Sequence, residues 1–142
     1  CVRVLRADGT DTGIAFHGVP GGHEFNSFVV GLYNAAGPGQ SIDPALAEAI
    51  AAIDRPLDLQ IVVALSCTMC PELVIAAQKI AASNPLVTAK VYDVNHFPEL
   101  RERYKIMSVP CLIINKAKVA FGKKTLGQLL ELLAEPEAGQ TG

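Results

Sequence analysis

Two cysteines, Cys67 and Cys70, stand directly behind a nearly continuous apolar stretch, and this arrangement constrains the fold more than any other feature of the chain. The stretch covers residues 57–65 (Leu-Asp-Leu-Gln-Ile-Val-Val-Ala-Leu) and is typical of a central strand buried on both faces of a sheet. Apolar side chains then recur at helical spacing as far as Ser83, just before an Asn-Pro pair that would end a helix. The pattern therefore predicts that both cysteines lie where a buried strand meets the N-terminus of a helix.

Such a position suits a redox-active cysteine. The thiolate is the nucleophile of thiol–disulfide exchange. At a helix N-terminus, the unpaired N–H groups and the positive end of the helix dipole would stabilise an anionic sulfur at Cys67. Cys70 could then close a disulfide with it, and Pro71 is tolerated because an N–H in the first helical turn has no helical partner. The pair therefore predicts dithiol/disulfide chemistry.

Two other interpretations of the pair remain open. A CxxC pair can be half of a zinc site, but that site needs two further ligands, and the candidates form no second close pair. The two cysteines could also be chemically idle residues of a helix. We expect no metal site in this chain. The candidate ligands considered are Cys1, Cys111, His17, His23 and His96.

The composition excludes several classes of protein. With 142 residues, half of them apolar, the chain can form one ordinary domain with a real core. A net charge of −2 and a pI near 5.9 give no basic surface for nucleic acid. No apolar run approaches the roughly 20 residues of a membrane span, and residues 1–20 lack the apolar block of a secretory signal. Four cysteines, too few and too unevenly spaced for a secreted disulfide scaffold, indicate a cytoplasmic protein.

The rest of the chain predicts alternating strands and helices, which indicates an α/β fold. The further strands are expected over residues 2–6, 14–17, 87–94, 110–115 and 118–121, and the further helices over residues 24–36, 43–54, 97–104 and 125–133. Residues 57–133 then follow the order β-α-β-α-β-β-α. Residues 1–37 follow β-β-α, the closing half of the same order. The two segments can be aligned from Cys1 and Cys111, which indicates a weak internal repeat.

Four short motifs add a resemblance to a known family. They are residues 16–27 (Phe-His-Gly-Val-Pro-Gly-Gly-His-Glu-Phe-Asn-Ser), residues 65–71 (Leu-Ser-Cys-Thr-Met-Cys-Pro), residues 83–85 (Ser-Asn-Pro) and Val109-Pro110. Residues 57–133 resemble a thioredoxin fold. Residues 14–133 resemble the N-terminal domain of the flavoprotein component of bacterial alkyl hydroperoxide reductase, a family with two tandem thioredoxin folds of which only the second keeps a CxxC pair. The chain departs from that family in lacking the front half of the first fold and in having Cys111 where a small residue without a thiol is expected.

The resemblance implies a division of the chain into four parts. These are residues 1–42, the β-β-α half of a vestigial thioredoxin fold; residues 43–56, a connecting helix; residues 57–134, a complete thioredoxin fold; and residues 135–142, a tail or linker. Half a fold leaves a sheet edge and one face uncovered, so we expect either self-association, as in a homodimer, or covering by the helix of residues 43–54. Since the chain opens on Cys1 rather than Met, we expect it to be an internal piece of a longer protein.

The resemblance also implies roles for the two cysteines and for a proline. Cys67 would be the solvent-facing, attacking thiolate, and Cys70 the resolving thiol. Pro110 would follow a cis peptide bond that faces the pair, so that the backbone of Val109 could bind a partner chain. Taken as a lone X-Pro pair, Val109-Pro110 would more commonly be an ordinary trans bond at the start of an edge strand.

A buried acid is expected by the same resemblance. Ordinary thioredoxins bury an aspartate on the strand before the CxxC pair, at the position that is Ile61 here. In the resembled family a glutamate of the first fold serves instead, and it corresponds to Glu24. A carboxylate held near Cys70 in a low-dielectric site would have a raised pKa and could take the proton of that thiol. Alternatively, Glu24 is a solvated residue in the first turn of a helix, where its charge is favourable to the helix dipole.

Together these features predict a thiol–disulfide oxidoreductase. By resemblance, it would pass electrons from a pyridine-nucleotide flavoprotein module to a peroxiredoxin or a similar disulfide partner. FAD and NAD(P)H would be bound by that module, with no cofactor in this domain. The alternatives are a stand-alone, glutaredoxin-like protein disulfide oxidoreductase and a binding module in which the CxxC pair is idle.

Overall fold

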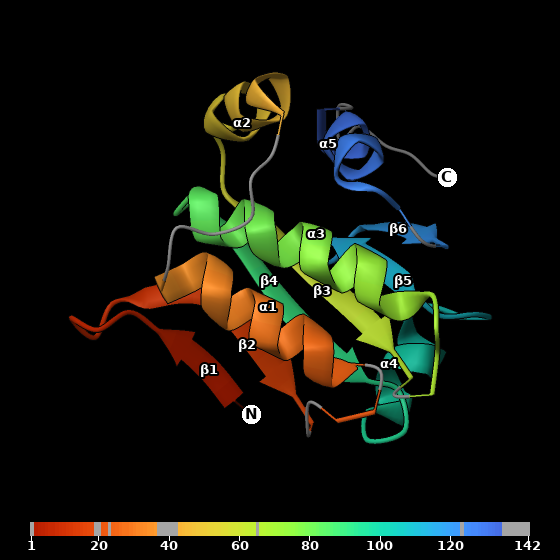
Figure 1. Ribbon diagram of the computed structural model, residues 1–142. Helices are drawn as coiled ribbons and strands as arrows, with labels where there is room; N and C mark the ends of the chain where they lie inside the picture. The colour runs from red at the N-terminus through yellow and green to blue at the C-terminus, as the bar shows by residue number, and fades with distance from the viewer. Residues whose placement is uncertain are drawn as a thin grey trace.

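The computed structural model describes residues 2–18, 21–22, 24–36, 43–64, 66–122 and 124–134. Six strands form one mixed sheet in the order β1-β2-β4-β3-β5-β6 (Figure 1). The elements are β1 (Val2–Leu5), β2 (Asp11–His17), α1 (Glu24–Ala36), α2 (Pro44–Ala51), β3 (Leu57–Val63), α3 (Cys70–Ser83), β4 (Val87–Asp93), α4 (Pro98–Arg103), β5 (Cys111–Ile114), β6 (Lys118–Phe121) and α5 (Leu126–Ala134).

The predicted α/β order is confirmed over the described residues. From β3 to α5 the chain follows β-α-β-α-β-β-α, and β1, β2 and α1 follow β-β-α. Most boundaries differ from the expected ones by a residue or two. The largest differences are three residues each: β2 begins at Asp11 rather than Ile14, and α2 ends at Ala51 rather than Asp54. The pairing of β2 with β1 shifts register after Val4, so that Leu5 still pairs with Asp11.

The leading β-β-α segment, formed by β1, β2 and α1, is built into the same sheet as the rest of the chain. β2 pairs in parallel with β4, with Ile14 opposite Ala89 and His17 opposite Tyr92. On one face of this sheet, α1 lies alongside α3 (Figure 1). The segment therefore shares one sheet and one core with β3 to α5. A boundary between two thioredoxin units remains a prediction.

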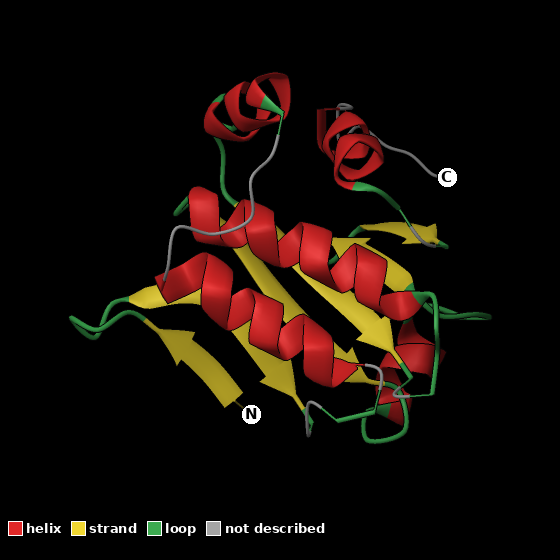
Figure 2. Cartoon of the chain, in the orientation of Figure 1, coloured by secondary structure: helices red, strands yellow, loops and turns green. Residues whose placement is uncertain are grey.

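The helix of residues 43–54 does not cover the leading segment, and the expectation that it would is wrong. Its regular part, α2, packs against α3 and α5 instead (Figure 2). The reason lies in Asn84, at the end of α3, whose amide donates to the carbonyls of Ile50 and Ile53 at 2.9 and 3.1 Å. At the edge of the sheet, β1 exposes Val2 and Leu5. Self-association through this side of the molecule therefore remains a prediction.

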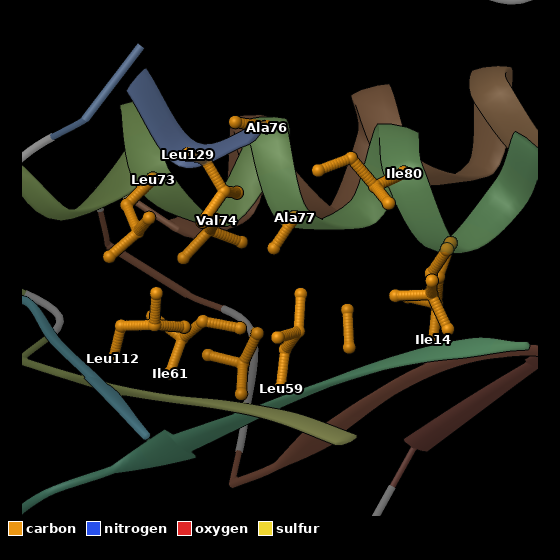
Figure 3. Close-up of a cluster of buried hydrophobic side chains, with 14 of the residues drawn as sticks. Ile14, Leu59, Ile61, Leu73, Val74, Ala76, Ala77, Ile80, Leu112 and Leu129 are labelled. Carbon is orange, nitrogen blue, oxygen red and sulfur yellow. The ribbon is translucent and has the colours of Figure 1, made fainter. Parts of the chain in front are cut away.

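Both faces of β3 are buried, as its apolar run predicts. Ile61 belongs to the larger core, in which side chains of α3 and α5 such as Leu73 and Leu129 cover the sheet (Figure 3). Its neighbour Val62 points to the opposite face and packs in a smaller core with Leu100 of α4. Because side chains of α3 and α4 pack against opposite faces of β3, the end of β3 is held rigidly and can present a reactive group in a fixed position.

Gly13 occupies a point of β2 where only glycine fits. Its φ is +82°, and a Cβ there would lie 2.8 Å from the carbonyl oxygen of Val87 in β4. We therefore expect Gly13→Ala to lower the free energy of unfolding by about 3 kcal/mol, measured by urea denaturation. Gly9→Ala is the control, because Gly9 also has a positive φ, +89°, but faces open space. It should lose only about 1 kcal/mol, and equal losses would contradict the proposed backbone clash.

Candidate active site

The two cysteines lie at the junction of β3 and α3, as the sequence predicts. After β3 the chain turns, and the Cys67 N–H donates to the Ala64 carbonyl at 2.9 Å. The helix α3 starts at Cys70, and the side chain of its N-cap residue, Met69, makes no capping hydrogen bond. Cys67 is half-buried, whereas Cys70 is completely buried. The Cys67 sulfur therefore lies before a helix N-terminus whose N–H groups lack a side-chain cap.

The Cys70 thiol is held in its protonated form. Burial raises its pKa well above the ordinary value for cysteine, and the neighbouring Cys67 side chain raises it further. The negative charge of Glu24 adds to this rise, which places that carboxylate within electrostatic reach of the thiol. The backbone of Ala64 opposes the rise only in part. Cys70 therefore needs a base before its sulfur can act as a nucleophile.

Glu24 opens α1 and turns its side chain into the protein. The helix starts from a Gly-Gly turn, in which the Glu24 N–H donates to the Gly21 carbonyl at 2.9 Å. The side chain is 0% exposed, and neither carboxylate oxygen has a partner of standard hydrogen-bond geometry among the described residues. Burial raises the pKa of Glu24 to about 7, although the Ser27 hydroxyl, one turn further on, opposes the rise. The alternative of a solvated first-turn glutamate does not hold, because this carboxylate has no access to solvent.

The loop before β5 faces the cysteine pair, and the expected cis bond between Val109 and Pro110 is confirmed. Pro110 is buried, and its carbonyl accepts a hydrogen bond from the Gly122 N–H at 3.0 Å. The Val109 carbonyl oxygen accepts from the Cys67 thiol at 4.0 Å. This loop therefore forms one wall of the surface on which Cys67 opens.

The remaining candidates take structural positions. Cys111 follows Pro110 directly, is 0% exposed, and has its pKa raised by burial to about 11. Ile61, at the position of the aspartate of ordinary thioredoxins, is also fully buried. His17 stacks on Tyr92. His96 pairs with a buried aspartate, while Cys1 and His23 lie outside the described residues.

Nowhere in the described residues do three or more His, Cys, Asp or Glu side chains gather closely enough to hold a metal ion. None of the described helices is both long and apolar enough to span a membrane.

Two polar residues beside this site, Ser27 of α1 and Gln78 of α3, were not predicted from the sequence. Both are completely buried. Gln78 lies one turn after Val74 and two turns after Cys70, among the apolar side chains that α3 buries. A glutamine at such a position is the signal that could have identified it.

Comparisons with known proteins agree with this geometry. A family model described as the thioredoxin domain matches residues 57–134. The alkyl hydroperoxide reductase protein AhpF from Pseudomonas aeruginosa is 33% identical over 135 residues, which are 95% of this chain and 25% of that protein. The chain thus spans about a quarter of the length of the curated relatives it matches.

Solved structures extend the similarity to the coordinates. The alkyl hydroperoxide reductase protein AhpF from Enterococcus faecalis superposes with a TM-score of 0.88 at 44% identity, over 92% of this chain and 62% of that one. A protein disulfide oxidoreductase from Aeropyrum pernix superposes with a TM-score of 0.74 at 23% identity, over 82% of this chain and 53% of that one. The thioredoxin-like α/β fold is therefore confirmed.

Proposed function

Because the chain belongs to the thioredoxin-domain family, we propose that it acts as a thiol–disulfide oxidoreductase. Its Cys67 and Cys70 carry electrons to the disulfide of a partner protein. The observation that supports this most directly is the pairing of a half-buried and a fully buried cysteine at the N-terminus of α3. The cis bond before Pro110 lies on the same surface. This is the arrangement that an attacking and a resolving thiol require.

In the first step, the Cys67 thiolate attacks one sulfur of the partner's disulfide. A bond forms between Cys67 and that sulfur, while the partner's other sulfur leaves as a thiolate and takes up a proton. Cys67 suits this role because it is the less buried of the pair and lies before the N-terminus of α3. The backbone of Val109, beside the Cys67 sulfur, would bind the partner chain next to its disulfide.

In the second step, Cys70 attacks the sulfur of Cys67. The bond between Cys67 and Cys70 forms, the bond to the partner breaks, and the partner leaves with both electrons. Since the Cys70 thiol is protonated and buried, it must lose its proton during this attack. Glu24 is the acceptor, because its buried carboxylate lies within electrostatic reach of that thiol and has a pKa of about 7.

The relatives suggest where the electrons come from and where they go. The alkyl hydroperoxide reductase protein AhpF is about four times as long as the part that this chain matches. We infer that a flavoprotein module, with FAD and NAD(P)H, reduces the cysteine pair, and that a peroxiredoxin-type disulfide receives the electrons. The pair itself needs no cofactor in this domain, since all of its redox chemistry takes place between sulfur atoms. We place this exchange in the cytoplasm.

The proposed shuttle is tested with the pre-reduced chain, freed of excess reductant. It should reduce insulin disulfides stoichiometrically, with the appearance of a bond between Cys67 and Cys70 in peptide mapping. When the flavoprotein module of an AhpF relative and NADH are added, reduction should become catalytic. Efficient recycling by glutathione instead would favour the stand-alone, glutaredoxin-like alternative. No insulin reduction by the reduced chain would overturn the function.

A further inference from the structure

The helix α1 buries a row of small and polar residues and exposes most of its large apolar side chains. Four small or polar residues of α1 are buried, one of them against Gln78 of α3, while four large apolar side chains of the same helix are 39–61% exposed and only Phe28 among the large ones packs against the core. This reverses the usual arrangement of a surface helix. The buried residues, spaced by three, four and three positions along one face, are Glu24, Ser27, Gly31 and Asn34; the exposed ones are Phe25, Val29, Leu32 and Tyr33.

The helix α3 meets this polar side with Gln78. The side chain of Gln78 is 0% exposed and lies two turns along α3 from Cys70. Its amide rests on Gly31, where a Cβ would lie 2.7 Å from the amide oxygen and 3.3 Å from the amide nitrogen. The Gln78 amide therefore lies on the side of α3 that faces α1. The absence of a side chain at Gly31 makes the space for it.

Unpartnered polar atoms concentrate at this one helix contact. Among the described residues, six buried side-chain oxygen or nitrogen atoms have no partner of standard hydrogen-bond geometry, and five of them lie here. They are both carboxylate oxygens of Glu24, the hydroxyl of Ser27 and both amide atoms of Gln78. Buried polar groups that find no protein partner are normally bound by ordered water, since leaving them bare costs about 1–3 kcal/mol each.

We propose that Glu24, Ser27 and Gln78 form a binding site for a short chain of ordered water molecules between α1 and α3, and that this chain carries the Glu24 proton away. The proposal rests on the proposed function, because the proton is the one that Cys70 releases. The step balances: the Cys70 proton passes to the Glu24 carboxylate as the cysteine disulfide closes. The carboxylic acid then releases that proton through the water chain to bulk solvent, and Glu24 is again a carboxylate that can act as a base.

In this scheme Gln78 is a positioning residue, since it acts on the reacting sulfur only through water and Glu24. A glutamine amide can donate to one water and accept from another, and it does not titrate, so it orders the chain without competing for the proton. Among the described residues, the titratable side chains that act on this region are Glu24 from α1 and Cys67 and Cys70 from α3 and the turn before it.

Gln78→Met in the whole chain tests the proposal, because Met matches the length of Gln but cannot order water. We expect the closure of the cysteine disulfide after attack on a peptide disulfide to be about tenfold slower at neutral pH, in single-turnover kinetics. Its solvent deuterium isotope effect should change as well, which a purely structural role of Gln78 would not cause. Gly31→Ala keeps Gln78 but displaces its amide, and should give the same two changes.

The stability of the same variant gives a readout that does not depend on activity. If water binds the Gln78 amide, Gln78→Met removes those hydrogen bonds, and the unfolding equilibrium constant should rise about fivefold in urea denaturation. If no water binds the Gln78 amide, Gln78→Met removes an unsatisfied buried polar group and the protein becomes more stable, which overturns the proposal. Gln60→Met is the matched control, since Gln60 is also a buried glutamine but lies in β3 and donates to Tyr92. It should leave the isotope effect unchanged.

The outcomes separate this inference from the proposed function. Wild-type kinetics and isotope effect in Gln78→Met would overturn the water chain while leaving the shuttle intact. A wild-type chain that reduces no disulfide would overturn the shuttle, and the stability comparison would still decide whether water is bound. A crystal structure of the reduced protein should show water within hydrogen-bond distance of both Gln78 amide atoms, and a dry contact would contradict the proposal.

Discussion

Cys70→Ser should convert the protein from an electron carrier into one that stays covalently bound to its partner. Cys67 keeps its place before the N-terminus of α3 and should still attack a partner's disulfide. Without the second sulfur the mixed disulfide cannot be resolved, so insulin reduction should fall by at least about a thousandfold. The covalent adduct on Cys67 should accumulate instead and can be identified by mass spectrometry of the intact protein and its peptides.

Two further variants complete this experiment. Cys67→Ser should lose turnover to the same extent without any trapped adduct on Cys70, because the Cys70 sulfur is buried and protonated. Cys111→Ser is the matched control, since Cys111 is equally buried but lies in β5 outside the pair. It should reduce insulin at the wild-type rate. An adduct that accumulates on Cys70 in Cys67→Ser would mean that the roles of the two cysteines are reversed.

The local parts of this site could be predicted from the sequence. The apolar run before Cys67 has the length of a buried strand, and the residues after Cys70 repeat at helical spacing, so the position of the pair followed from short-range patterns. The cis bond at Pro110 and the burial of Glu24 needed the family resemblance in addition. Neither residue type alone distinguishes these states from their more common alternatives.

The parts that failed depend on contacts between distant segments. The apolar side chains of α1 recur at helical spacing, yet most of them are exposed, while Gly31 of the same helix is buried against Gln78 of α3. The partner of a helix face is not encoded in the periodicity of that face. Likewise, the pairing of β2 with β4 joins residues far apart in the chain, and no local sequence feature of β2 identifies β4 as the strand it pairs with.

Glu24→Gln should remove a pH dependence of folding stability that the wild-type protein shows. The pKa of Glu24 rises from 4.5 to about 7 on folding, so the folded state favours the protonated carboxyl. This contribution to stability is fully present below about pH 4.5 and is lost as the pH rises through 7, by about 3 kcal/mol in total. Urea denaturation of the reduced protein between pH 5 and 8 measures it. Gln cannot ionise, so the variant should gain stability relative to wild type as the pH rises.

The same substitution should slow the closure of the Cys67–Cys70 disulfide by about a hundredfold at neutral pH, the scale of a lost general base. Below pH 7 the wild-type carboxyl is itself protonated, so the two proteins should converge there, and the variant's rate should rise only as hydroxide or buffer replaces the base. Attack by Cys67 on the partner should be unchanged, because Glu24 acts on Cys70. Stopped-flow kinetics with a fluorescent peptide disulfide separates the two steps. Equal closure rates at pH 8, together with parallel stability curves, would leave Glu24 as a buried helix residue without a part in the reaction.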